Sequence, residues 1–216
     1  MNHLLVAPPE AKALLVLAHG AGSGMRHPFF ERAAEALGER NVATYRYEFP
    51  YMEKGAGRPD LPAVAEARVR EAVLDAARVA PGLPLFAGGK SFGGRMTSQA
   101  QAKEPLPALR GLVFLGFPLH PPGRPGTTRA EHLSHVRIPM LFLQGTRDDF
   151  AGLDLLRPIV KGLGASATLH VVEGGDHSFK VLKRSGRTDA DVLAELAETI
   201  ASWVGNPGAM PRGQHA

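Results

Sequence analysis

Short apolar segments recur at regular intervals along the chain, and longer segments that mix polar and apolar residues separate them. Several of the short segments lack the apolar–polar alternation that is typical of a half-exposed strand. Strands of a parallel sheet are apolar along their whole length, because helices cover both faces of the sheet. We therefore predict six central strands, at residues 13–20, 42–49, 83–89, 111–119, 139–145 and 167–175. Residues 3–6 would add an antiparallel edge strand.

The longer segments carry apolar residues at three- and four-residue spacing, which is the period of one helix face. In residues 27–40 this face consists of Phe30, Ala33, Ala34 and Leu37. The same pattern predicts three further helices, at residues 61–80, 92–104 and 189–205. Strands that alternate with helices indicate an α/β fold with a right-handed, doubly wound and mostly parallel sheet.

The longest connection without a clear pattern covers residues 120–139, and it has room for one short helix. No inserted domain fits there, so any lid over a site would be small. The whole chain has 216 residues, which suits one α/β domain better than two. We predict a single domain over residues 1–205 and a flexible C-terminal tail over residues 206–216.

Composition and charge narrow the classes of function. Apolar residues make up 44% of the chain and charged residues 21%, as in an ordinary soluble globular protein. The net charge of +4 is modest and charges of both signs are interspersed, which argues against a nucleic-acid partner. The N-terminus has no secretion-signal pattern, and no apolar run approaches the roughly 18 residues of a membrane helix. We expect a cytoplasmic protein that does not associate with membranes.

The chain contains no cysteine, which excludes disulfides, thiolate nucleophiles and cysteine-bound zinc. Three histidines, His120, His132 and His135, lie in the connection without a clear pattern. Their spacing does not suggest a metal site with a carboxylate, and we expect them at the surface. We therefore expect no metal and no cofactor.

Residues 87–95 read AGGKSFGGR, a sequence that fits two different chemistries. A phosphate-binding loop, G-x-x-x-x-G-K-[ST], would need glycine at position 84, where the chain has Pro84 in a predicted strand. The nucleophile elbow of acyl hydrolases, G-x-S-x-G, needs small residues two positions before and two positions after its serine. Gly89 and Gly93 occupy those positions, so we predict that Ser91 is a nucleophile.

A serine nucleophile needs an acid and a histidine base, which follow it in this order along the chains of α/β hydrolases. Asp148 and Asp149 follow the fifth central strand, and His177 follows the sixth. Because the C-terminal ends of parallel strands meet at one edge of the sheet, these side chains should lie beside Ser91. We take Asp148 as the acid and interpret Asp149 as a solvated or capping carboxylate.

An oxyanion hole must also lie beside the serine, to stabilise negative charge on the substrate oxygen. Its first expected donor is the N–H of Phe92, directly after the nucleophile. The loop at residues 19–25, HGAGSGM, should supply the second donor. The N–H of Ala21 is the expected donor of this loop, and the N–H of Gly22 is a less favoured one.

The same loop has an alternative interpretation as the dinucleotide-binding pattern G-x-G-x-x-G. Met25 stands where that pattern has its third glycine, and the pattern leaves Ser91 and His177 without a role. Two other residues near the predicted site have open interpretations. His27 lines the cleft or begins a helix, and Lys90 adds positive potential beside Ser91 or lies at the surface.

Seven segments together resemble the small α/β hydrolases that are related to the dienelactone hydrolases: LAHGAGSGM, HPFF, YEFPYME, GGKSFGGRM, LGFPLHPPG, LQGTRDDF and GGDHSFK. More narrowly, the chain resembles the branch that includes the testis-expressed and NSL-complex-subunit-like hydrolases, over residues 4–205. The resemblance implies an α/β-hydrolase fold with little or no cap. It also implies Ser91 as nucleophile, Asp148 as acid and His177 as base.

We therefore expect a serine hydrolase that acts on a carboxyl ester, lactone or thioester of a small molecule through an acyl-enzyme intermediate. The alternative is a non-catalytic binding or scaffold protein with the same fold, because some proteins of the resembled branch are scaffolding subunits. The chain has candidates for all three members of a triad, which favours the enzyme. The sequence does not indicate an oligomeric state.

Overall fold

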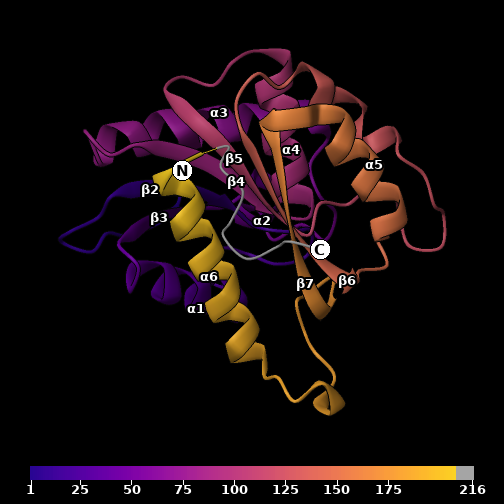
Figure 1. The fold of residues 1–216 in the computed structure, drawn as a ribbon. Coiled ribbons are helices and arrows are strands. Elements are labelled where there is room, and N and C mark those ends of the chain that lie inside the picture. The colour runs from indigo at the N-terminus through magenta and orange to yellow at the C-terminus, as the bar shows by residue number, and fades with distance from the viewer. Residues whose placement is uncertain (208–216) are drawn as a thin grey trace.

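The computed structural model describes residues 1–207, which build one sheet with helices packed on both of its faces (Figure 1). The seven strands are β1 (His3–Val6), β2 (Ala13–Ala18), β3 (Val42–Tyr47), β4 (Leu85–Lys90), β5 (Leu109–Leu115), β6 (Met140–Arg147) and β7 (Ala167–Asp176). Their order in the sheet is β1-β3-β2-β4-β5-β6-β7. β1 pairs antiparallel with β3, and every other neighbouring pair is parallel. The predicted α/β fold with a doubly wound, mostly parallel sheet is confirmed.

The α-helices within residues 1–207 are α1 (Pro28–Gly38), α2 (Pro50–Glu53), α3 (Pro62–Val79), α4 (Phe92–Lys103), α5 (Leu153–Leu163) and α6 (Asp189–Gly205). Short 3₁₀ helices add η1 (Thr128–His135), η2 (Gly164–Ser166) and η3 (Lys183–Ser185). Four of the α-helices correspond to the predicted ones. The sequence pattern does not predict α5, in which Pro158 lies inside the helix. Proline is unfavourable there because it removes a backbone donor.

The two faces of the sheet pack against different helices, and residues of one strand alternate between them. In β2, Leu14 and Val16 belong to the core that includes α3, α4 and α5, whereas Leu15 and Leu17 belong to the core with α1 and α6. Figure 1 shows this arrangement, with α1 and α6 on one side of the sheet. Burial on both faces explains why the strands read as continuous apolar runs.

The connection after β5 is more ordered than expected. His120 is 7% exposed, and the Nε2 atom of His132 on η1 lies 2.7 Å from the Ser98 Oγ on α4. Burial of this ring lowers the pKa of His132 to about 4. The expectation of surface positions is therefore wrong for His120, whose N–H donates to the Phe150 carbonyl, and for His132, because η1 packs against α4. His135 is exposed, as expected.

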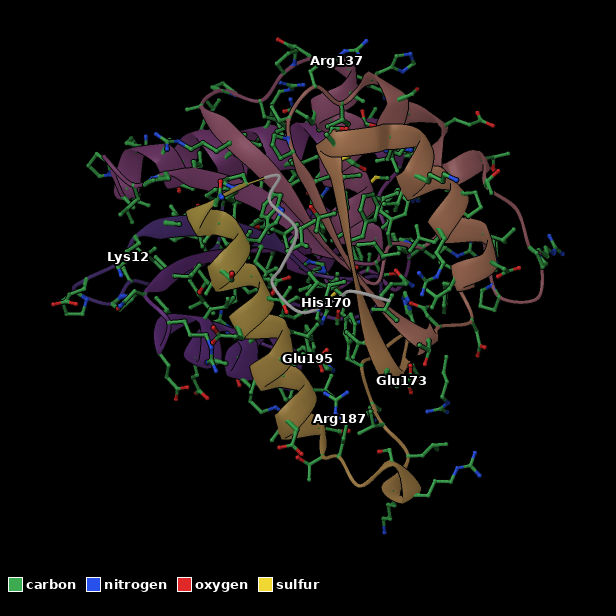
Figure 2. The ribbon with its side chains drawn as sticks, viewed as in Figure 1. Lys12, Arg137, His170, Glu173, Arg187 and Glu195 are labelled. Carbon is green, nitrogen blue, oxygen red and sulfur yellow. The ribbon has the colours of Figure 1, made fainter. Side chains whose placement is uncertain are left out.

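Polar contacts tie the edge strand β7 to the beginning of α6. His170 on β7 lies 2.6 Å from Glu195 on α6, measured from Nε2 to Oε1. Arg187 donates to the other oxygen of Glu195 and, at 3.3 Å, to the backbone carbonyl of Glu173 on β7. Figure 2 labels these four side chains, of which His170 and Glu173 belong to β7, Glu195 to the N-terminal half of α6 and Arg187 to the segment just before α6. The end of the connection that leads into α6 is thus held against β7.

Three expectations from the sequence concern membrane association, the C-terminal tail and the single domain. None of the helices within residues 1–207 is long and apolar enough to cross a membrane. Of the tail predicted at residues 206–216, only residues 206 and 207 are described, and the rest lies outside the described residues. The single domain over residues 1–205 stays a prediction.

The strand order changes direction next to β2. The chain runs from β2 to β3 on one side and then returns to β4 on the other side of β2. The loops that follow β2 and β4 therefore leave the sheet in different directions, and the space above the two strands is where α/β proteins bind their ligands. The loop at residues 19–25 and Ser91 both begin at this point.

Candidate active site

Ser91 lies at the turn between β4 and α4, where its backbone has φ of 50° and ψ of −114°. A residue other than glycine is strained in this region and is held there by its surroundings. A Cβ atom on Gly89 would lie 2.3 Å from the carbonyl oxygen of Ala18, and one on Gly93 would lie 2.5 Å from that of His19. These two positions therefore require glycine. The turn has the geometry that the nucleophile-elbow motif describes.

The structure brings the three predicted triad residues together from three different strand ends. The Nε2 atom of His177 lies 2.9 Å from Ser91 Oγ, and its Nδ1 atom lies 2.8 Å from Asp148 Oδ2. With the proton of the neutral ring on Nδ1, the ring donates to the carboxylate and accepts from the serine hydroxyl. Asp149, the alternative acid, is exposed to solvent.

The carboxylate of Asp148 is buried and fixed by amide donors. Its Oδ2 atom accepts a hydrogen bond from Gln144 Nε2 at 2.6 Å, and its Oδ1 atom accepts one from the Phe150 N–H at 2.8 Å. Gln144 is itself oriented, because its Oε1 atom accepts from the Phe117 N–H at 3.0 Å. These contacts keep Oδ2 directed at the His177 ring.

The imidazole of His177 is packed between an aromatic ring and a glycine. The Phe150 ring stacks on it with centroids 4.1 Å apart and an angle of 24° between the planes. On the Asp148 side, a Cβ atom added to Gly116 would lie 3.3 Å from both Asp148 Oδ2 and His177 Nδ1. Gly116 also has φ of +68°, which ends β5 four residues earlier than predicted. A larger residue there would crowd the histidine–carboxylate pair.

A tight turn at residues 176–180 carries His177. The carboxylate of Asp176 accepts hydrogen bonds from the N–H groups of Ser178 and Lys180, at 2.8 and 2.9 Å. Phe179 is held at φ of 60° and is buried. Asp176 therefore shapes the turn from within, which is a structural use of a carboxylate adjacent to the base.

The expected oxyanion donors lie on two sides of Ser91. Phe92 is the first residue of α4, where backbone N–H groups have no partner within the helix and carry the positive end of its dipole. The loop at residues 19–25 passes close by, since a Cβ atom on Gly20 would lie 3.8 Å from Ser91 Cβ. This approach brings the backbone around Ala21 to the serine.

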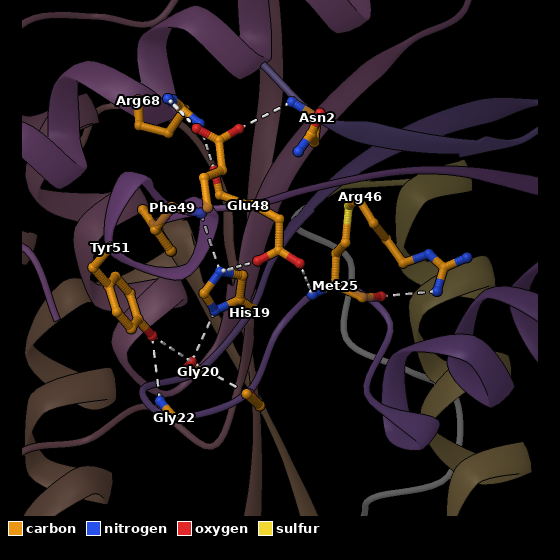
Figure 3. Close-up of polar contacts among 12 residues, drawn as sticks. Asn2, His19, Gly20, Gly22, Met25, Arg46, Glu48, Phe49, Tyr51 and Arg68 are labelled. Atoms are coloured by element: carbon orange, nitrogen blue, oxygen red, sulfur yellow. Dashed lines mark hydrogen bonds and ion pairs between the residues drawn. The ribbon is translucent and has the colours of Figure 1, made fainter. Parts of the chain in front are cut away.

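The side chains of His19, directly after β2, and Tyr51, from the segment after β3, fix the peptide group that contains the Ala21 N–H (Figure 3). The Gly20 carbonyl, which belongs to the same peptide, accepts from His19 Nδ1 at 2.9 Å and from Tyr51 Oη at 3.3 Å. In a trans peptide the N–H points away from the carbonyl. The Gly22 N–H donates to Tyr51 Oη at 3.2 Å. Gly22 thus already has a partner, which favours Ala21 as the oxyanion donor.

His19 is fully buried, and burial lowers its pKa, although the Gly20 carbonyl and the charge of Glu48 oppose this effect. The ring is therefore neutral. The Phe49 N–H donates to Nε2 at 3.1 Å, so the ring proton is on Nδ1, where it faces Gly20. Glu48 fixes the far end of the loop, since its Oε1 atom accepts from the Met25 N–H at 3.1 Å (Figure 3).

The structure also places the two residues that had open interpretations, His27 and Lys90. His27 begins α1, and its Nδ1 atom accepts from the Phe29 N–H at 3.2 Å. It also lines a cavity of about 450 Å³ between α1 and α6, whose lining does not include Ser91 or His177, so its place in the active-site cleft stays a prediction. Lys90 lines the same cavity, but it is half-buried and its Nζ atom donates to the backbone carbonyl of His177. It is therefore not a surface residue.

Sequence reasoning missed four residues of this site: Gly116, Gln144, Phe150 and Tyr51. Gln144 had a signal, because it is a single polar residue in the apolar run MLFLQG. The other three had none, since their contacts depend on how neighbouring strands are aligned. Among residues 1–207, no group of three or more histidine, aspartate or glutamate side chains is placed to hold a metal ion.

Comparison with known proteins adds a family match. The family model described as "Alpha/beta hydrolase domain" matches residues 11–205. A dienelactone hydrolase from Anabaena variabilis is 21% identical, covers 95% of this chain and 91% of its own, and superimposes with a TM-score of 0.72. An α/β serine hydrolase without lid from Xanthomonas campestris is 20% identical, with 97% and 90% covered and a TM-score of 0.70. An α/β serine hydrolase homologue from Coxiella burnetii is 18% identical, with 93% and 89% covered and a TM-score of 0.72.

Proposed function

The chain belongs to the alpha/beta hydrolase family, and from this premise we propose that it is a serine hydrolase of carboxyl esters, lactones or thioesters. Family membership supports a hydrolase in general. The finer proposal rests on one observation, the unbroken chain of contacts from Ser91 Oγ through both nitrogens of His177 to Asp148 Oδ2. These are the contacts that an activated serine requires.

In the first half of the proposed reaction, Ser91 Oγ attacks the carbonyl carbon of the substrate. His177 Nε2 takes the hydroxyl proton, and the carbonyl electron pair moves onto the oxygen. Collapse of this tetrahedral intermediate breaks the bond to the leaving group, which takes the proton from Nε2 and departs as an alcohol or a thiol. In a lactone it stays attached to the acyl chain. The product of this half is an acyl ester of Ser91.

In the second half, water attacks the acyl carbon and gives a proton to Nε2. The second tetrahedral intermediate then collapses, the bond to Ser91 Oγ breaks, and the proton on Nε2 returns to the serine. A carboxylic acid leaves. Asp148 stabilises the positive imidazole during both halves and keeps its tautomer fixed, without itself taking a proton.

The developing oxyanion in both halves would be held by the N–H groups of Phe92 and Ala21. Donors that are already in position stabilise the transition state without reorganisation, and losing one typically slows the reaction about a hundredfold to a thousandfold. The helix dipole of α4 adds to the contribution of Phe92.

We also propose a substrate class, a family branch, a domain organisation and a location for the protein. We place the substrate among small molecules and the chain within the branch of testis-expressed and NSL-complex-subunit-like hydrolases. We also propose a single domain over residues 1–205, a cytoplasmic location and no nucleic-acid partner. The competing function is a binding or scaffold protein that uses the same fold without catalysis.

A fluorophosphonate probe, which reacts with activated serines, separates the two functions. We expect labelling of Ser91, located by mass spectrometry of the digested protein, and hydrolysis of p-nitrophenyl esters. Both should be lost in Ser91→Ala and His177→Ala and kept in Ser178→Ala, which removes an exposed hydroxyl beside the base. A folded wild-type protein that neither takes up the probe nor hydrolyses any ester would favour the scaffold. Esters of rising chain length then measure the size of the acyl pocket.

A further inference from the structure

Lys90 occupies the variable position before the serine in the elbow motif, and its side chain reaches the turn that carries the base. Its Nζ atom donates a hydrogen bond to the backbone carbonyl of His177. We propose that Lys90 is a positioning residue, which holds the His177 turn against the strand that carries Ser91. This inference rests on the proposed function, because it assigns Lys90 a role in the same serine–histidine pair.

The strand order explains why such a link matters. Ser91 follows β4 and His177 follows β7, and two other strands, β5 and β6, lie between them in the sheet. In the sheet formed by residues 1–207, β7 is an edge strand that pairs with β6 alone. Small shifts between three successive strand pairs would add up in the distance between Ser91 Oγ and His177 Nε2. Lys90 connects the two ends of this series directly.

The turn cannot replace this link by its own contacts. The hydrogen bonds of Asp176 determine the internal shape of residues 176–180, but they do not attach the turn to β4. A turn of fixed shape can still tilt as a unit, and such a tilt would move the His177 ring away from the serine. The bond from Lys90 acts at the backbone of His177 itself, so it opposes this motion.

The lysine side chain is itself held in place. Its Nζ atom lies 5.6 Å from the ring centroid of Phe29 and 5.2 Å from that of Phe179. These two rings are stacked, with centroids 6.2 Å apart and an angle of 15° between their planes. Both are within the range of cation–π attraction. Phe29 belongs to α1 and Phe179 to the turn, so the ammonium contacts rings from two separate elements.

The ammonium is retained although its burial is unfavourable. Burial lowers the pKa of Lys90 to about 8, while the charges of Asp148 and Asp176 oppose this effect. A methionine would fill the same space without a charge to desolvate. A lysine that is unfavourable for folding and contacts the base fits a functional role better than a structural one.

The test compares Lys90→Met with Lys180→Met. Both remove one ammonium from the surroundings of the turn, but Lys180 is exposed and contacts the turn through its backbone. With p-nitrophenyl acetate, an uncharged substrate, we expect Lys90→Met to lower kcat by about tenfold to a hundredfold, the scale of a misplacement near 1 Å. KM should not change. Labelling by the fluorophosphonate should slow by a similar factor, and Lys180→Met should match the wild type.

Two further measurements separate positioning from other roles. The proton NMR signal of the His177 Nδ1–H, hydrogen-bonded to Asp148, should shift or broaden in Lys90→Met and stay unchanged in Lys180→Met. Lys90→Arg keeps a donor and should restore part of kcat. If Lys90 acted only through positive potential on the developing oxyanion, kcat would still fall in Lys90→Met, but the NMR signal would not move, and this outcome would overturn the positioning role.

The possible failures are distinguishable. A wild type that neither labels nor hydrolyses overturns the proposed function, and this role for Lys90 with it. A wild type that is active, with Lys90→Met equal to Lys180→Met in kcat and in the NMR signal, overturns the role of Lys90 alone. If Lys90→Met does not fold, Lys90→Gln, which is shorter and more polar, must show the same loss for the inference to stand.

Discussion

The loop that carries Ala21 and the turn that carries His177 face the same serine, but they are held in different ways. The loop at residues 19–25 follows β2, an inner strand that lies between β3 and β4, and side chains from the segment after β3 contact it. The turn at residues 176–180 follows the edge strand β7. We call the loop at residues 19–25 the oxyanion side and the turn at residues 176–180 the base side.

The oxyanion side is held by several donors that act on one atom. The Gly20 carbonyl accepts hydrogen bonds from His19 Nδ1, Tyr51 Oη and Ser23 Oγ, at 2.9, 3.3 and 3.3 Å. Glu48 adds a separate contact at the Met25 N–H. The Ser23 N–H also donates to this carbonyl, at 3.4 Å, so removing one of the three side-chain donors leaves three donors in place and the direction of the carbonyl should change little.

On the base side, each contact acts on a different part of His177. Within residues 1–207, Asp148 receives the His177 Nδ1–H, and Lys90 donates to the His177 carbonyl. Phe150 supports one face of the ring. Single substitutions of similar size should therefore slow the reaction more on the base side than on the oxyanion side. This difference can be tested with paired variants.

The largest effect is expected from Asp148→Asn. An asparagine side chain at this position is nearly the same size but cannot stabilise a positive imidazole, and its amide N–H₂ group favours the wrong histidine tautomer. We expect kcat for p-nitrophenyl acetate to fall about ten-thousandfold. The matched control is Asp149→Asn, on the exposed neighbour, which should stay within about twofold of the wild type because exposed charges contribute little. Equal losses in the two variants would contradict the assignment of the acid.

The choice of Asp148 over Asp149 came from the sequence, and so did most of the fold. The fold was predictable because each central strand is buried on both faces and reads as a continuous apolar run. The antiparallel edge strand was predictable from its place before a short turn. α5 was not, because Pro158 interrupts a pattern that packing nevertheless stabilises. The burial of His120 and His132 could not be read from the sequence, since it depends on contacts with Phe150 in one case and on how η1 packs against α4 in the other.

For the site, chain order and strand ends were enough to bring Ser91, Asp148 and His177 to one edge of the sheet. The residues that orient them were not predictable in the same way. Tyr51 meets the Gly20 carbonyl only because β3 lies beside β2. Lys90 could have pointed to either face, and its contact with the His177 carbonyl depends on the position of β7 two strands beyond β5.

A smaller effect is expected on the oxyanion side, from Tyr51→Phe. The hydroxyl donates to the Gly20 carbonyl and accepts from the Gly22 N–H, and both contacts are lost in phenylalanine. His19 and Ser23 still hold the carbonyl, so we expect kcat to fall by about threefold to tenfold, less than the loss of an oxyanion donor itself. Tyr45→Phe, which removes a hydroxyl bonded to Asp75, is the control and should leave kcat unchanged. A hundredfold loss in Tyr51→Phe would show that the two sides are equally sensitive.

The smallest expected effect is on the free energy of unfolding, which should depend on pH differently for Lys90 on the base side and His19 on the oxyanion side. Lys90 on the base side has its pKa lowered to about 8 from an ordinary value of 10.5, so between these values the unfolded chain binds more protons than the folded one. The free energy of unfolding of the wild type should therefore rise with pH from 8 to 10.5 relative to Lys90→Met. His19 on the oxyanion side also has a lowered pKa, but its effect is a loss of stability on acidification below about 6.5.

Denaturant unfolding of the wild type and Lys90→Met, measured in steps of pH, isolates the contribution of Lys90, because the other titrating groups are common to both proteins. Below pH 8 the difference should be constant and should favour the variant, which has no ammonium to bury. Above pH 8 it should narrow as the lysine of the folded wild type loses its proton. A difference that stays flat to pH 10.5 would mean that the Lys90 ammonium is as well solvated in the folded chain as in the unfolded one. The base side would then hold its turn without the unfavourable burial of a charge.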